Sequence, residues 1–69
     1  MLEDAKAKLR AALLEEGLLR TREGIRLATM VEELEAQGET ELAEATREIA
    51  RRNELELMKV RERFKALNE

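Results

Sequence analysis

The chain of 69 residues contains no cysteine, histidine, proline, serine, tryptophan or tyrosine. Without cysteine it can form neither a disulfide nor a zinc–thiolate site. Histidine, cysteine, serine and tyrosine often serve as nucleophile or general base in enzymes, and the three glycines are too isolated to form a phosphate-binding loop. We therefore expect no enzymatic activity, no catalytic residue and no cofactor.

Long apolar runs are missing as well. The longest covers only residues 11–14, whereas a membrane-spanning helix needs roughly 20 apolar residues. Residues 1–30 also lack the compact apolar segment of a secretory signal. The sequence predicts no membrane association and, for a natural protein, a cytoplasmic location, which the absence of cysteine fits.

The residues that are present are mostly helix formers. Alanine, glutamate, leucine, arginine and lysine make up 50 of the 69 residues, a composition typical of long helices and coiled coils. Although 42% of the residues are charged, the net charge is only −3 and the apolar residues recur periodically, which favours folded helix over disorder. The length predicts one domain over residues 1–69, and tight helix packing or a partner subunit is expected to support so short a chain.

The clearest interruption lies at residues 37–40. Gly38 predicts the end of a helix, because glycine readily adopts the left-handed backbone angles favoured just past a helix C-terminus. Thr40 is predicted to cap the next helix through its hydroxyl, and acidic residues follow in the first turn, where the helix dipole favours them. We expect this second helix over about residues 41–67.

Residues 2–37 allow two interpretations. Gly17 could end a short helix and Thr21 could cap another, or one long helix could run through both Gly17 and Gly24, each glycine costing about 1 kcal/mol relative to alanine. The apolar spacing continues across Gly17, which favours one helix, kinked or broken at most near residues 17–24.

Apolar residues form a wide face in the first segment and a matching stripe in the second. Together they predict an all-α fold, an antiparallel helical hairpin in which facing residue numbers sum to about 76–77. Leu27 would then face Ile49, and Leu34 would face Leu42. The predicted core and interface residues are Leu9, Leu13, Leu14, Leu18, Ile25, Leu27, Val31, Leu34, Leu42, Ile49, Leu57, Val60, Phe64 and Leu67.

The middle of this hairpin is predicted to be more polar than its ends. Arg20 occupies a position otherwise held by leucine, Glu56 is expected to face it, and Asn53 is expected one turn away, opposite Gly24. These three residues could form a polar layer that specifies register or partner choice, as buried polar residues do in coiled coils. The alternative is that Arg20 lies along the apolar face with its charged end in water.

Charge is distributed unevenly along the chain. Residues 27–48 have a net charge of −6, whereas residues 1–26 and 49–69 have net charges of +1 and +2. The hairpin turn is therefore acidic and the end with both termini slightly basic. An antiparallel pair of hairpins would bring these unlike ends together, so the sequence predicts a homo-oligomer, with a dimer that forms a four-helix bundle favoured.

Two other kinds of partner fit less well. Several glutamates lie near the turn, but carboxylate metal sites inside helical bundles also use histidine, and the chain contains none. No metal site is therefore expected. Basic residues follow position 50, but glutamates interleave with them and no tryptophan or tyrosine is available for base stacking, which argues against nucleic acid.

The whole chain resembles de novo designed helical bundles in its alanine, glutamate, leucine and arginine content and its short glycine-containing turn. That resemblance implies a scaffold without catalytic activity. Gly17, Gly24 and Arg20 on the apolar face depart from an idealised design. A natural adaptor that binds partner helices through its apolar face is therefore the alternative to a self-associating structural protein.

Overall fold

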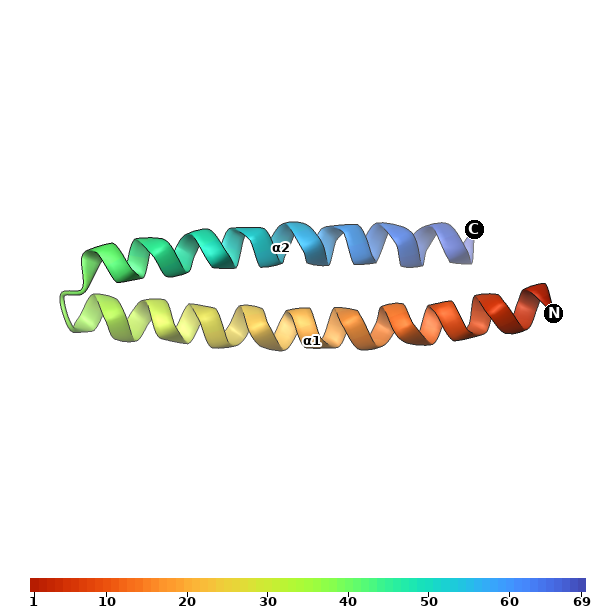
Figure 1. Cartoon of the computed structure of the whole chain (residues 1–69), viewed down its shortest axis with the longest axis horizontal. Helices are drawn as coiled ribbons and strands as arrows, with labels where there is room; N and C mark the ends of the chain where they lie inside the picture. The colour runs from red at the N-terminus through yellow and green to blue at the C-terminus, as the bar shows by residue number, and fades with distance from the viewer.

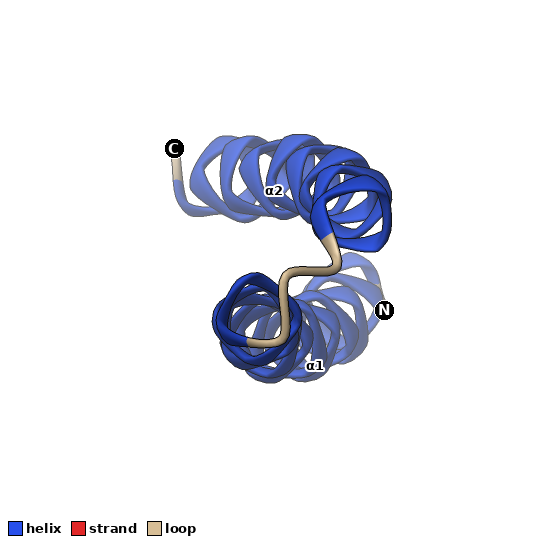
Figure 2. Ribbon diagram, turned by 90° about the vertical axis from the view of Figure 1, so that its left-hand side faces the viewer, coloured by secondary structure: helices blue, strands red, loops and turns tan.

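The computed structural model describes all 69 residues and consists of two helices. α1 (Leu2–Ala36) and α2 (Thr40–Asn68) run antiparallel and pack along their length into a rod of 55 × 14 × 12 Å (Figure 1). This confirms the predicted all-α hairpin. Seen along the rod, each helix has only the other as a neighbour (Figure 2).

α1 is continuous, so the interpretation with two short helices is wrong. Gly17 and Gly24 both lie inside the helix, and the hydroxyl of Thr21 donates to the carbonyl of Gly17, 2.8 Å away, instead of capping a new helix. Packing of α1 along α2 outweighs the local preference of glycine, whose cost is only about 1 kcal/mol per residue.

The connection between the helices is short because α1 ends on a hydrogen-bonded glycine turn. Gly38 has a φ of 75°. Its N–H donates to the carbonyl of Glu35 at 3.0 Å, and the N–H of Glu39 donates to the carbonyl of Leu34 at 2.9 Å. These two bonds define a Schellman ending, which satisfies carbonyls that the last helical turn would leave free.

The prediction that Thr40 caps α2 is wrong. Thr40 is the first residue of the helix, the preceding Glu39 is the N-cap, and no side chain caps this end. The helix begins at this point because the carbonyl of Glu39 already accepts a hydrogen bond from the N–H of Ala43, 2.9 Å away.

The core is one narrow seam between the helices. It contains seven buried residues: Leu13, Leu27, Ala43, Thr46, Asn53, Leu57 and Val60. Near the turn the buried position is Ala43, whereas the predicted core residues Leu42 and Ile49 are more than half exposed. Small side chains allow the helices to approach closely at this end. Neither helix contains a stretch that is long and apolar enough to cross a bilayer.

Candidate interaction surface

One side of α1 carries large apolar side chains that α2 does not cover. Leu14, Leu18 and Ile25 are 55%, 59% and 66% exposed, and Thr21 and Ala28 continue their spacing of three and four residues. We call this side of the hairpin the open face. It consists of Leu14, Leu18, Thr21, Ile25 and Ala28 of α1 with Glu54, Arg61 and Lys65 of α2, which line the same two hollows.

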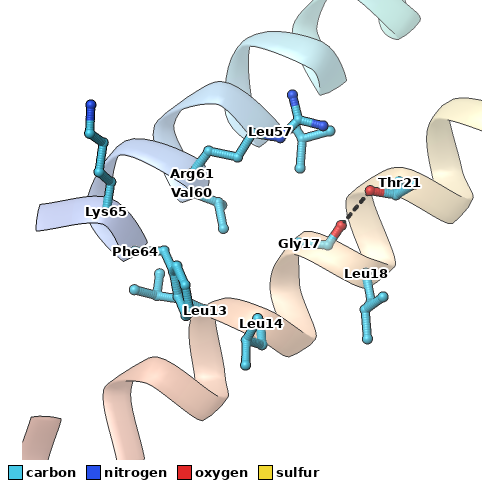
Figure 3. Close-up of a pocket in the computed structure, with 10 residues that line it drawn as sticks. All are labelled: Leu13, Leu14, Gly17, Leu18, Thr21, Leu57, Val60, Arg61, Phe64 and Lys65. Atoms are coloured by element: carbon cyan, nitrogen blue, oxygen red, sulfur yellow. Dashed lines mark hydrogen bonds between the residues drawn. The ribbon is translucent and has the colours of Figure 1, made fainter. Parts of the chain in front are cut away.

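The first hollow is an apolar groove of about 370 Å³ near the open end of the rod (Figure 3). Gly17 lies on its floor between the helices, and Leu14 and Leu18 line its α1 side. Arg61 and Lys65 of α2 also line this groove, so its lining contains two cationic side chains besides the apolar ones. Such a groove suits an apolar surface with acidic residues at its edge.

The second hollow continues the first toward the turn, because Thr21, Leu57 and Arg61 line both of them. It extends the uncovered surface of α1 to Ile25 and Ala28. The open face is thus one elongated surface along the rod. Isolated exposed leucines are common on protein surfaces, but a mostly apolar stripe of this kind is a candidate interaction surface.

The hairpin buries only part of the predicted core. Leu13, Leu27, Leu57 and Val60 are buried in the seam, and Val31, Leu34, Phe64 and Leu67 are partly covered at its ends. The remaining six predicted residues are exposed: Leu9, Leu14, Leu18, Ile25, Leu42 and Ile49. Three of these six, together with Thr21 and Ala28, form the α1 side of the open face.

The structure brings together two of the three residues of the predicted polar layer. Asn53 is buried, its amide nitrogen donates to the carbonyl of Arg20 at 2.8 Å, and its amide oxygen accepts from the Arg20 guanidinium at 3.4 Å. Glu56 instead pairs with Lys59 on its own helix, at 3.2 Å. The polar layer is therefore an arginine–asparagine pair in which both hydrogen-bonding groups of the asparagine side chain are satisfied.

Replacing Asn53 with leucine is expected to raise the free energy of unfolding by about 1 kcal/mol, because the change removes a buried amide without leaving a buried partner unpaired. Leucine has room because Gly24, opposite Asn53, has no side chain. Urea denaturation followed by circular dichroism measures the change. Sedimentation velocity should then show more than one species, since polar core residues restrict coiled-coil register. A lower stability with one species would contradict this role.

Most ion pairs lie within a single helix, but one joins the two helices near the turn, where Arg47 and Glu35 approach to 2.8 Å. A hydrogen bond from Arg26 lowers the pKa of the Glu23 carboxyl below its ordinary value of 4.5, and Arg51 lowers the pKa of Glu48 in the same way. Stability from these two pairs is present above the carboxyl pKa of the unfolded chain and is lost as pH falls through the lowered values.

The acidic residues near the turn do not form a cluster of three or more side chains that could hold a metal ion. The sequence pattern did not reveal the Glu35–Arg47 pair, because it depends on the geometry of the turn.

No protein-family model matches the chain, and neither curated proteins nor solved structures give a significant match.

Proposed function

We propose that this chain is a non-catalytic structural protein that self-associates, and that two hairpins pair antiparallel into a four-helix bundle. The observation that carries this proposal is the open face, where Leu14, Leu18 and Ile25 remain more than half exposed along one side of α1. Covering them with a second copy removes apolar surface from water, the main favourable term in protein association.

The charge distribution supports a second copy as the occupant. The acidic turn segment, residues 27–48, has a net charge of −6, and the segments that form the open end have net charges of +1 and +2. With the two turns at opposite ends of the bundle, each acidic segment lies against the other hairpin's basic end. Individual surface pairs contribute about 0–1 kcal/mol, so charge selects the orientation and apolar burial provides most of the affinity.

Sedimentation equilibrium tests the proposal with a matched pair of variants. Leu14→Glu places two charges in the proposed dimer interface. Leu55→Glu makes the same change on the outer side of α2, at a leucine of similar exposure: Leu14 is 55% exposed and Leu55 is 58% exposed. We expect the wild type and Leu55→Glu to dimerise at micromolar concentration. Leu14→Glu should raise the dissociation constant at least tenfold, because a carboxylate is desolvated without a partner.

Three outcomes would contradict self-association through the open face. A wild-type chain that is strictly monomeric at about 200 µM and still melts cooperatively would exclude the dimer, because this concentration is far above a micromolar dissociation constant. Equal dissociation constants for Leu14→Glu and Leu55→Glu would place the interface elsewhere. A monomer with fluctuating tertiary packing that orders only when a partner helix is added would favour the adaptor function instead.

A further inference from the structure

The apolar stripe of the open face has the same spacing in both directions along α1. Ala7 and Ala11 extend the spacing of Leu14, Leu18, Thr21, Ile25 and Ala28 toward the N-terminus, and the charged Glu32 extends it toward the turn. All eight positions are exposed, and successive positions are separated alternately by four and three residues. Such an alternating pattern is symmetric about the middle of every gap, but only at the level of residues 19–20 does each of these eight positions have another of the eight as its counterpart. A second α1 that runs antiparallel at this level therefore meets the stripe position for position, with facing residue numbers that sum to 39.

Two of the four facing pairs in this arrangement are matched in size, while Leu18 would meet the partner's Thr21 and Ala7 would meet the partner's Glu32. Leu14 meets the partner's Ile25, and Ala11 meets the partner's Ala28. Under two-fold symmetry each of these contacts occurs twice, which is the defining property of an isologous interface. The alternation of three and four residues is also the spacing that lets side chains of antiparallel helices interlock.

Opposite placement of the two turns independently requires that α1 lie beside α1. In a square bundle of two hairpins, turns at the same end place each α1 next to the partner's α2, whereas turns at opposite ends place α1 next to α1 and α2 next to α2. The first arrangement would press Leu14 and Leu18 against a charged α2 surface. The second buries apolar residues against apolar residues, in agreement with the charge distribution.

The α2 side of the open face fits the same two-fold axis. Within the hairpin, a Cβ on Gly17 would lie 3.7 Å from Val60, and one on Gly24 would lie 3.5 Å from Asn53, so facing residue numbers sum to 77. The axis therefore crosses α2 at residues 57–58, and facing positions of two α2 helices sum to about 115. Glu54 then meets the partner's Arg61, and neither residue has an ion pair within its own hairpin.

We infer that two copies of the hairpin pair about a two-fold axis at the level of residues 19–20 of α1, with Leu14 against the partner's Ile25 and Glu54 against the partner's Arg61. This inference rests on the proposed self-association and adds its register and contacts. The two helices of each hairpin support it through different chemistry, the Leu14–Ile25 and Ala11–Ala28 contacts on α1 and charge complementarity on α2.

Cysteine cross-linking tests the register directly, because the chain contains no cysteine of its own. Leu14→Cys and Ile25→Cys are made in separate chains and mixed in a glutathione redox buffer. Only the mixture should form a covalent dimer. Like cysteines in a homodimer would lie 11 residues apart along antiparallel helices, or about 16 Å at 1.5 Å per residue, which is too far for a disulfide.

Charge reversal provides a second measurement that does not depend on oxidation. Glu54→Arg should weaken the dimer about tenfold, because it places two arginines opposite each other at both symmetric contacts. The double variant Glu54→Arg/Arg61→Glu should restore wild-type affinity. Lys59→Glu/Glu56→Lys exchanges charges that already pair within α2, at 3.2 Å, and serves as the control that leaves affinity unchanged.

Sedimentation and cross-linking together separate an incorrect register from an absence of self-association. A dimer by sedimentation in which the mixed cysteine variants cross-link no faster than either variant alone would overturn the register and leave self-association intact. Rapid cross-linking of Leu14→Cys with itself would place residue 14 against the partner's residue 14, and would also overturn the inference. A strictly monomeric chain would remove both proposals.

Discussion

Replacing Leu27 with alanine is expected to lower the free energy of unfolding by about 2–5 kcal/mol, the usual range for a leucine truncated in a core. Leu27 is 2% exposed, the least exposed leucine of the chain, and the seam contains only seven buried residues. No second layer of side chains can close around the lost volume, because each helix has only one neighbour within the hairpin. A small domain has only about 5–15 kcal/mol of stability in total, so this change alone should unfold a measurable fraction of the chain at room temperature.

Urea denaturation followed by circular dichroism at a fixed protein concentration measures this effect. Leu55→Ala is the matched control, since Leu55 is 58% exposed on α2 and its truncation leaves no cavity. We expect this control to change stability by less than about 1 kcal/mol. Equal losses for the two variants would mean that the seam around Leu27 does not dominate the stability of the protein.

Replacing both glycines inside α1 with alanine is expected to stabilise the protein by about 2 kcal/mol, because each glycine in a helix interior costs about 1 kcal/mol relative to alanine. The structure leaves room for both methyl groups. A Cβ at position 17 would lie 3.7 Å from Val60 and one at position 24 would lie 3.5 Å from the Asn53 side chain, both ordinary contact distances. The substitution Gly17→Ala also adds a methyl group to the floor of the apolar groove.

The control for the two glycines is the third one. Gly38 has a φ of 75°, so Gly38→Ala should lower stability by about 1 kcal/mol through backbone strain, although no atom lies within 4 Å of the added methyl group. Thermal or urea unfolding of the two variants should therefore shift in opposite directions. Destabilisation by Gly17→Ala/Gly24→Ala would show that the helices approach more closely at these positions than the contact distances imply.

The proposed dimer and these stability predictions are linked. The hairpin buries few residues by itself, and a second copy would cover Leu14, Leu18 and Ile25. If self-association contributes to folding, the unfolding midpoint of the wild type will rise with protein concentration. Core variants should therefore be compared at one concentration, so that the loss of packing is not confused with a change in dimer population.

The sequence alone determined the helical hairpin and the place of its turn. Leucine, isoleucine and valine recur every three or four residues on both sides of Gly38. Of the three glycines, only Gly38 coincides with a break in this apolar spacing. The capping of α2 could not be read from local residue type, because Thr40 is an ordinary N-cap residue that the hydrogen bonds of the turn place inside the helix.

Only the tertiary structure decided the path of α1 and which of its faces pairs with α2. The conformational preference of Gly17 permits a helix end, and packing along α2 overrides it. Two adjacent stripes of α1 are comparably apolar in sequence, one containing Leu13 and Leu27 and the other Leu14, Leu18 and Ile25. The first is buried and the second exposed, because a helix with a single neighbour can bury only one side, and that choice leaves the open face uncovered.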